Sequence, residues 1–134
     1  TLPMARYAGF VMGVEVDEPM VNKAFENARL NQMANAEFVK ADLFAEGSLM
    51  LDAFKKHRWD KVLLDPPRAG ALLMAHELGR LKVPKIVYVS CNPATLARDV
   101  GVLVHEYGYQ LSSAGMMDMF PHTSHIEAMV LLER

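Results

Sequence analysis

The segment Lys85-Ile86-Val87-Tyr88-Val89-Ser90-Cys91-Asn92-Pro93 joins a short apolar run to a polar end. The run is rich in β-branched and aromatic residues, which predicts a buried strand over 85–90. The proline suits the first turn of a helix, so a helix is expected over 93–107. Cys91 then falls at a strand-to-helix junction, at the carboxyl edge of a sheet, where α/β enzymes bind ligands.

The rest of the chain repeats this alternation of short apolar runs and longer helical patterns. Further strands are expected over 10–16, 37–42, 61–65, 109–117 and 127–133, and further helices over 19–31, 47–57 and 70–79. Such alternation predicts a mostly parallel sheet with right-handed crossovers. The last two strands have no helix between them and predict a closing antiparallel hairpin. The expected fold class is therefore α/β.

Candidate core positions follow from the periodicity of these segments. The strand over 61–65 is apolar along most of its length, which is typical of a strand buried on both faces. The expected core positions on the first two long helices are Val21, Phe25, Ala28 and Leu30, and then Leu49, Leu51 and Phe54.

Composition limits the possible functions. The chain has 134 residues, 51% of them hydrophobic, which is enough for one domain with a core. Its net charge of -2 argues against a free-standing RNA-binding surface, so an RNA substrate would need attraction from another segment. No apolar run is long enough to span a membrane, and no protein partner is evident. The single cysteine fits a cytoplasmic location.

Three acidic residues follow predicted strands. Glu15 ends the first strand, where a carboxylate can accept hydrogen bonds from both ribose hydroxyls of a nucleotide. Asp42 ends the next and can meet an adenine amino group. Either residue can instead cap the following helix. Asp65 opens the stiff turn Asp65-Pro66-Pro67-Arg68, which fixes the direction of its carboxylate or serves only as a rigid turn.

Cys91 and Glu127 are the candidates for covalent and acid–base chemistry. A partly exposed thiolate is a strong nucleophile and a helix amino terminus stabilises it, whereas a buried thiol is inert. Glu127 lies where a loop re-enters an apolar strand, which suits a general base, although it can also be an ordinary strand-edge carboxylate. His122 and His125 lack a third placed ligand, so no metal site is expected.

Nearly the whole chain resembles the class I S-adenosylmethionine-dependent RNA (uracil-5-)-methyltransferases, with a Rossmann-like sheet. The resemblance is strongest over 64–70, 87–99 and 118–127, which contain Asp-Pro-Pro-Arg, Ser-Cys-Asn-Pro-Ala-Thr-Leu-Ala-Arg-Asp and Met-Phe-Pro-His-Thr-Ser-His-Ile-Glu. The second and third of these favour the bacterial 23S ribosomal RNA branch of the family over the transfer-RNA branch.

The resemblance implies a role for each candidate. Cys91 matches the family nucleophile and Glu127 the family base, while Glu15, Asp42 and Asp65 match positions that contact S-adenosylmethionine. Thiolate attack at C6 of uracil makes C5 nucleophilic, and a base then removes the C5 proton after methylation. Arg68, Asn92 and His122 are secondary candidates for contact with the base.

The chain also departs from the family pattern. Family members carry a glycine-rich cofactor loop after their first sheet strand, an amino-terminal RNA-binding domain and, in many cases, an iron–sulfur cluster. One cysteine cannot supply a four-thiolate cluster site. Residues 1–134 are therefore expected to be an amino-terminally truncated catalytic domain, lacking that strand and loop and weak or inactive alone. Any cluster would belong to the missing amino-terminal part.

Three alternatives stay open. A related enzyme would methylate a uracil of transfer RNA, or another uracil of ribosomal RNA, by the same mechanism. A degenerate module of this fold would only bind RNA or protein, and would need neither Cys91 nor Glu127. An amino-group methyltransferase would use the Asp-Pro-Pro turn to hold a planar nitrogen and would tolerate loss of the thiol.

Overall fold

The computed structural model describes residues 1–42, 54–119, 122 and 126–134. The chain forms two compact units, Thr1–Phe54 and Lys55–Arg134. The expected helix over 47–57 lies mostly outside the described residues, as do its candidate core positions Leu49 and Leu51. Phe54 is described and is buried, as expected.

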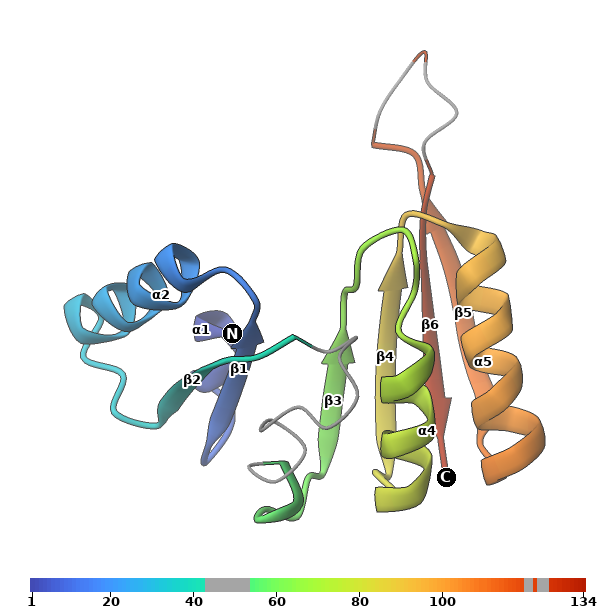
Figure 1. The fold of residues 1–134 in the computed structure, drawn as a ribbon, viewed down its shortest axis with the longest axis horizontal. Coiled ribbons are helices and arrows are strands. Elements are labelled where there is room, and N and C mark those ends of the chain that lie inside the picture. The colour runs from blue at the N-terminus through green and yellow to red at the C-terminus, as the bar shows by residue number, and fades with distance from the viewer. Residues whose placement is uncertain (43–53, 120–121, 123–125) are drawn as a thin grey trace. The chain divides into compact units, whose positions relative to one another are not determined.

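The first unit is a short helix followed by one strand–helix–strand arrangement (Figure 1). Its elements are α1 (Leu2–Ala5), β1 (Val11–Glu15), α2 (Glu18–Leu30) and β2 (Ala36–Lys40), and β1 pairs with β2 in parallel. The sequence patterns did not predict α1. The other three elements are confirmed to within about two residues at each end, which is the ordinary precision of such boundaries.

The buried side of α2 is narrower than the pattern predicted. Val21 and Ala28 are buried, but Phe25 is 48% and Leu30 66% exposed, so the expectation of four core positions was wrong for two. A two-stranded sheet covers only a narrow stripe of a helix. Phe25 still meets the Phe38 ring of β2 edge-to-face, with centroids 5.2 Å apart.

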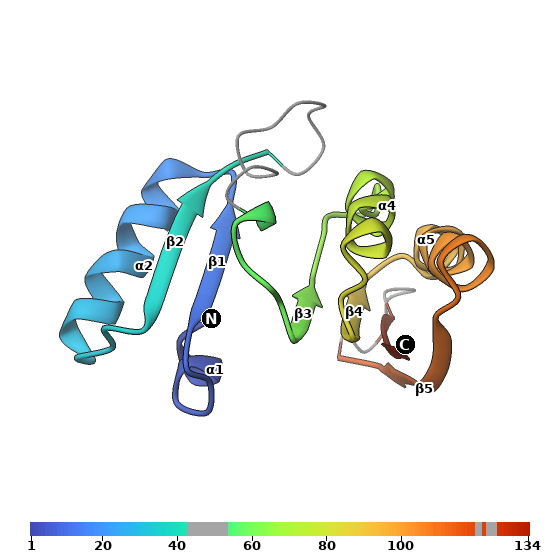
Figure 2. The same ribbon diagram turned by 90° about the horizontal axis from the view of Figure 1, so that it is seen from below.

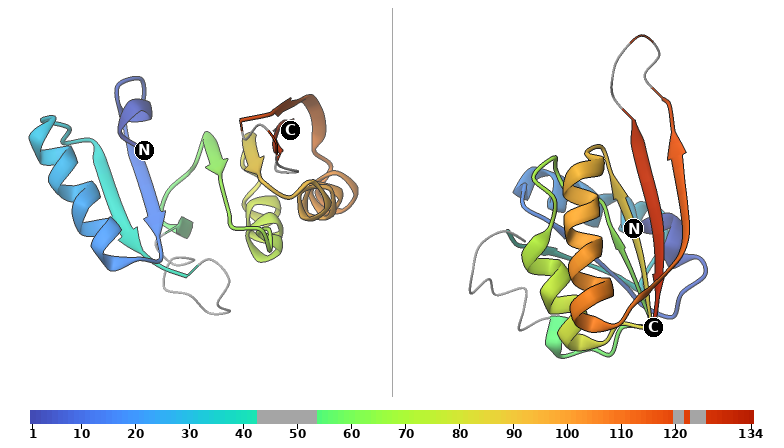
Figure 3. Two further views of the ribbon diagram at one scale, coloured as in Figure 1. Left: turned by 90° about the horizontal axis from the view of Figure 1, so that it is seen from above. Right: turned by 90° about the vertical axis from the view of Figure 1, so that its right-hand side faces the viewer.

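The second unit is a four-stranded sheet in the order β3-β4-β6-β5. Its elements are β3 (Lys61–Leu64), α4 (Leu72–Leu81), β4 (Lys85–Ser90), α5 (Pro93–Tyr107), β5 (Gln110–Met117) and β6 (Glu127–Glu133). β3 and β4 are parallel, and β6 runs antiparallel to both β4 and β5, which confirms the closing hairpin. Figure 3 shows β5 and β6 side by side.

Helices α4 and α5 lie on one face of this sheet (Figure 2). Side chains therefore alternate along β4, where Ile86, Tyr88 and Ser90 are fully buried against the helices and the residues between them are half-buried. The expectation that β3 is buried on both faces was wrong. Leu64 is buried, but Leu63 points to the opposite face and is 48% exposed.

Among the described residues, no helix is long and apolar enough to cross a membrane.

Candidate active site

Three of the predicted site residues lie at one edge of the second unit. Asp65 follows β3, Cys91 follows β4, and Glu127 is the first residue of β6. The parallel pairing of β3 with β4 and the antiparallel pairing of β4 with β6 place these three strand ends at the same edge of the sheet. The sheet thus brings together residues that are far apart in the sequence.

Cys91 and Glu127 each adjoin the last pair of residues in the β4-β6 register. Ser90, the last residue of β4, pairs with Ala128, so extending the register by one residue sets Cys91 opposite Glu127. Directly paired residues of antiparallel strands share a face of the sheet. Ser90 and Ala128 are buried on the helix-covered face, which leaves the other face for Cys91 and Glu127.

Exposure and local structure suit these residues to chemistry. Cys91 and Glu127 are half-buried, and Asp65 is exposed. Cys91 directly precedes Asn92, the N-cap of α5, whose side-chain oxygen accepts a hydrogen bond from the Ala94 N–H at 3.1 Å. The amino terminus of α5 therefore begins directly after the thiol-bearing residue.

The other two candidates share an edge of the first unit. Glu15 ends β1, and Asp42 follows β2 and is exposed. Because β1 and β2 are parallel, both residues come at the carboxyl edge of their sheet. The Glu15 Oε1 accepts hydrogen bonds from the backbone N–H groups of Val16 at 2.7 Å and Asp17 at 3.1 Å. The carboxylate is thus oriented by its own backbone.

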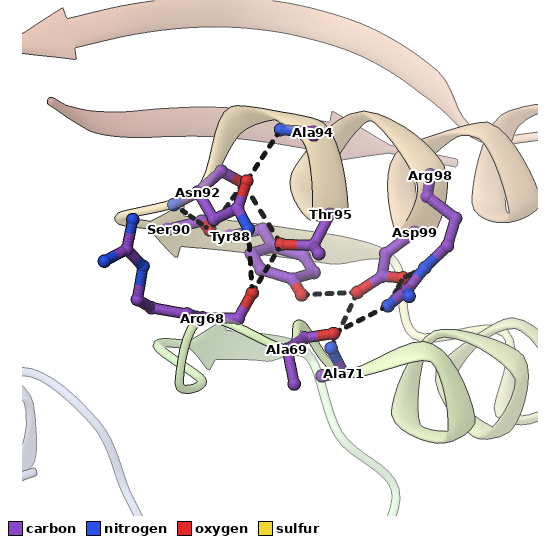
Figure 4. A network of polar contacts seen from close by, with 10 residues as sticks. All are labelled: Arg68, Ala69, Ala71, Tyr88, Ser90, Asn92, Ala94, Thr95, Arg98 and Asp99. Atoms are coloured by element: carbon purple, nitrogen blue, oxygen red, sulfur yellow. Dashed lines mark hydrogen bonds and ion pairs between the residues drawn. The ribbon is translucent and has the colours of Figure 1, made fainter. Parts of the chain in front are cut away.

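The structure adds a polar network that sequence reasoning missed (Figure 4). Its centre is Asp99 of α5, whose side chain is fully buried. The Asp99 Oδ2 accepts hydrogen bonds from the Tyr88 hydroxyl at 2.6 Å and from the Ala71 N–H at 2.7 Å, and Oδ1 accepts one from the Arg98 Nε at 2.8 Å.

Burial and this carboxylate affect the neighbouring groups. Burial, and then the hydrogen bond to Asp99, raise the pKa of Tyr88 well above its ordinary value, so the hydroxyl keeps its proton. The hydrogen bond to Asp99 also raises the pKa of Arg98. A sequence signal for the network existed, because Asn92, Thr95, Arg98 and Asp99 follow a three-and-four spacing along one face of a predicted helix.

The structure places the three secondary candidates, Arg68, Asn92 and His122, in different settings. The Asn92 side chain caps α5 and donates to the Arg68 carbonyl at 3.0 Å, so it serves the local fold. The Arg68 guanidinium extends away from that carbonyl (Figure 4). His122 is exposed with a left-handed φ of 67°. Among the described residues, no group of three or more His, Cys, Asp or Glu is placed to hold a metal ion.

Comparison with known sequences shows which enzymes this chain is similar to. The chain is 53% identical to the 23S rRNA (uracil(1939)-C(5))-methyltransferase RlmD of Hahella chejuensis, and the match covers 100% of this chain and 30% of that protein. The enzyme of the same name from Alcanivorax borkumensis is 51% identical, over 100% of this chain and 29% of its own length. The chain thus spans about 30% of these relatives.

Solved structures agree in fold. The tRNA (uracil-54, C5)-methyltransferase of Pyrococcus abyssi, solved with S-adenosyl-L-homocysteine, is 35% identical with a TM-score of 0.77, over 96% of this chain and 30% of that one. Magnesium protoporphyrin IX methyltransferase from Synechocystis, solved with S-adenosylmethionine, has a TM-score of 0.70 at 19% identity, over 100% of this chain and 64% of that one, and shows the shared fold alone.

The chain has the α/β fold of class I methyltransferases, as its sequence predicted. A family model described as tRNA (Uracil-5-)-methyltransferase matches residues 1–134. The chain therefore belongs to the RNA uracil-5-methyltransferase family.

Proposed function

We propose that residues 1–134 are part of the catalytic domain of an enzyme that transfers a methyl group to C5 of a uridine in 23S ribosomal RNA. The observation that carries the proposal is that Ser90 and Ala128 are paired at one sheet edge, with Cys91 directly after Ser90 and Glu127 directly before Ala128. Relatives named for this reaction, at 53% and 51% identity, support the choice of ribosomal RNA.

The cofactor in this proposal is S-adenosylmethionine, which supplies a sulfonium methyl group. The residues present fit it, because the Glu15 carboxylate is fixed at the end of β1 and the exposed Asp42 follows the neighbouring parallel strand. Glu15 would accept from the ribose hydroxyls and Asp42 from the adenine amino group. Asp65 of the second unit is kept as a further candidate cofactor contact because it matches the family position in the sequence. Support comes from the relative solved with S-adenosyl-L-homocysteine.

The proposed chemistry begins with Cys91. Its thiolate attacks C6 of the uracil, forming an S–C6 bond and moving an electron pair onto the ring as an enolate. C5 would then accept the methyl group that bound S-adenosylmethionine supplies, and the electron pair of the broken S–CH3 bond would stay on the cofactor. The Glu127 carboxylate removes the C5 proton, the C5=C6 double bond re-forms, and the S–C6 bond breaks. The target base must leave its stack to reach this edge.

Further segments are part of the proposal. The chain spans about 30% of its relatives and carries a net charge of -2, whereas RNA binding relies on cationic contacts to phosphates. We expect the remaining segments to supply those contacts, and the chain alone to transfer methyl groups weakly or not at all. Methyl transfer by the chain alone at the rate of a full-length relative would contradict this expectation.

A covalent trap tests the reaction. A hybrid enzyme is made in which this chain replaces the matching stretch of the Hahella chejuensis relative. The hybrid is incubated with S-adenosylmethionine and ribosomal RNA containing 5-fluorouridine. Fluorine leaves no C5 proton to remove, so the enzyme should stall as a protein–RNA adduct through Cys91, visible by denaturing mass spectrometry.

Matched variants assign the roles in this assay. Cys91→Ala should abolish the adduct while leaving cofactor binding intact. Glu127→Gln should still form the adduct on ordinary uridine but release it about 10²–10⁴-fold more slowly. Cofactor binding without any adduct, in a folded hybrid, would instead favour a binding-only module or amino-group methylation.

Transfer RNA is the second candidate substrate. It is favoured by the description of the family model and by the Pyrococcus abyssi neighbour. Competition between fluorinated ribosomal RNA and fluorinated transfer RNA for the same hybrid separates the two. Preferential trapping on transfer RNA would overturn the ribosomal assignment without affecting the chemistry.

A further inference from the structure

The segment that follows β3 is fastened along one face of α5. The Arg68 carbonyl accepts hydrogen bonds from the Asn92 side chain at 3.0 Å and from the Thr95 hydroxyl at 3.1 Å. The Ala69 carbonyl accepts one from Arg98 at 2.9 Å, and the Ala71 N–H donates to Asp99 at 2.7 Å. We name these contacts of Asn92, Thr95, Arg98 and Asp99 the loop clamp (Figure 4).

Asp99 is the point at which three elements meet. It belongs to α5, it accepts from Tyr88 of β4, and it accepts from the backbone of Ala71, the N-cap of α4. Ala71 has no side-chain cap of its own, so the carboxylate binds an N–H group at the positive end of α4. A fully buried carboxylate is held only where its oxygens have donors, which makes this junction geometrically strict.

The backbone at Gly70 is shaped to the loop clamp. Gly70 has a left-handed φ of +81°, and a Cβ atom there would lie 2.7 Å from both an Arg98 nitrogen and an Asp99 oxygen. The Gly70 N–H also donates to the Pro67 carbonyl at 2.9 Å, which closes a turn. The segment from Pro67 to Ala71 thus fits closely against α5.

The loop clamp joins the two halves of the candidate site in this unit. At one end of the fastened segment, the stiff pair Pro66-Pro67 leads directly from Asp65. At the other side, Cys91 is bonded to Asn92, whose N–H donates to the Ser90 hydroxyl at 3.0 Å. Movement of the fastened segment would therefore change the position of Asp65 relative to Cys91.

We propose that Asp99 is a positioning residue for methyl transfer, holding the segment after Asp65 against the amino end of α5 so that Asp65 and Cys91 keep a fixed relation. The inference rests on the proposed function and deepens it. Asp99 is fully buried and acts through other groups. A shift of about 1 Å in reacting groups can cost about 10²-fold in rate, which is the scale such a residue controls.

The chain offers a matched control at the other end of the same unit. Tyr88 and Tyr109 are both buried, with 0% and 2% exposure, and both hydroxyls are hydrogen-bonded. The Tyr88 hydroxyl donates to Asp99, whereas the Tyr109 hydroxyl donates to the backbone carbonyl of Val83 at 2.7 Å. Replacement of either tyrosine by phenylalanine removes one buried hydroxyl, but only Tyr88→Phe touches the loop clamp.

The first measurement needs neither cofactor nor RNA. Cys91 is the only cysteine, so the rate of alkylation of the folded chain by iodoacetamide reports on this site alone. Loosening of the loop clamp should expose the half-buried thiol, so Tyr88→Phe and Thr95→Val should accelerate alkylation by about three-fold or more. Tyr109→Phe should stay near the wild-type rate, and Thr95→Ser, which keeps the hydroxyl, should restore it.

The second measurement is methyl transfer by the hybrid enzyme. Asp99→Asn and Tyr88→Phe should lower kcat by about 10- to 100-fold with KM for RNA little changed, whereas Tyr109→Phe should alter neither. Circular dichroism of each variant confirms folding, and Thr95→Val gives the same test if Asp99→Asn does not fold. A merely structural role would make Tyr88→Phe and Tyr109→Phe equivalent.

The two measurements separate failure of this inference from failure of the proposed function. Equal alkylation rates for Tyr88→Phe, Thr95→Val and Tyr109→Phe would overturn the positioning role, whether or not the hybrid methylates RNA. Absence of methyl transfer by a folded wild-type hybrid would contradict the proposed function instead. Faster alkylation together with a selective fall in kcat would support both.

Discussion

The two ends of the β3-β4-β6-β5 unit are held together by different means. At the end that carries Cys91, a buried carboxylate gathers the Tyr88 hydroxyl, the Ala71 N–H and the Arg98 side chain. At the opposite end, the neutral Tyr109 hydroxyl donates to the carbonyls of Leu78 and Val83.

Close apolar packing adds to the hydrogen bonds at the Tyr109 end of the unit. Gly79 of α4 lies so close to the Tyr107 ring that a Cβ atom would overlap it. Burial of a carboxylate costs desolvation energy, and apolar residues of similar volume are often at least as stabilising. The difference therefore indicates that the end beside Cys91 is built for fixed geometry and the other end for stability.

Removal of the central carboxylate should give the largest effect. Asp99→Ala leaves the Tyr88 hydroxyl and the Arg98 guanidinium without their buried partner, so we expect a loss of about 3–5 kcal/mol in the free energy of unfolding. Tyr109→Phe removes a neutral donor and should cost about 1–2 kcal/mol. Urea denaturation of both variants measures the contrast, and equal losses would contradict it.

Gly70 and Gly79, the close-packed glycines described in the second unit, should respond differently to substitution. Gly70→Ala forces a left-handed φ on alanine and places its Cβ against Arg98 and Asp99, so we expect a loss of about 2–4 kcal/mol. Gly79→Ala gains about 1 kcal/mol of helix propensity and meets only the Tyr107 ring, so a net loss of about 1–2 kcal/mol is expected. Thermal unfolding of both variants measures the two losses of stability. A larger loss for Gly79→Ala than for Gly70→Ala would contradict the expected order.

Alkaline pH should weaken both ends through their tyrosines. Burial raises the pKa of Tyr88 and of Tyr109, so both keep their protons in the folded chain at pH values where an unfolded tyrosine ionises, above about pH 10. Each tyrosine should then cost about 1.4 kcal/mol of stability per pH unit above that point, and nothing below it. Between about pH 9 and pH 11, the free energy of unfolding measured by urea denaturation should fall less for Tyr88→Phe than for the wild-type chain. An equal fall in the free energy of unfolding for Tyr88→Phe and the wild-type chain would contradict the buried, protonated state of Tyr88.

Exposed ion pairs should contribute least to the stability of the folded chain. Lys85 and Glu133 approach to 2.6 Å at the Tyr109 end, but both side chains are more than one-third exposed and solvent screens the pair. Lys85→Gln should leave the urea midpoint within experimental error. Arg98→Gln, which breaks an ion pair to a fully buried carboxylate at the other end, should lower the midpoint measurably.

Much of this architecture was predictable from local patterns. The strand over 85–90 and the helix over 93–107 match β4 and α5 residue for residue, because a dense apolar run, a first-turn proline and a left-handed Gly108 mark the ends clearly. Helix α4 begins later than predicted, at Leu72, because Gly70 forms the turn onto α5. That turn depends on contacts distant in sequence.

The candidate site was predictable in part, because local patterns locate the ends of strands. Strand ends can be located from apolar runs, so the shared edge of Asp65, Cys91 and Glu127 follows from the expected sheet. The position of β6 between β4 and β5, which brings Glu127 to the sheet edge that carries Cys91, depends on pairing that local patterns do not encode. Asp99 was missed because a helical carboxylate is usually exposed, and only the tertiary contact with Tyr88 shows otherwise.

The strand order also affects biosynthesis. β6 follows β5 in the chain, yet it lies between β4 and β5 and is hydrogen-bonded to both. A nascent chain that has emerged only as far as β5 therefore lacks the strand that joins β5 to β4, and Glu127 has not yet reached the edge that carries Cys91. The β4-β6-β5 arrangement therefore closes, and Glu127 reaches the edge that carries Cys91, in the same step, when β6 pairs with both neighbours.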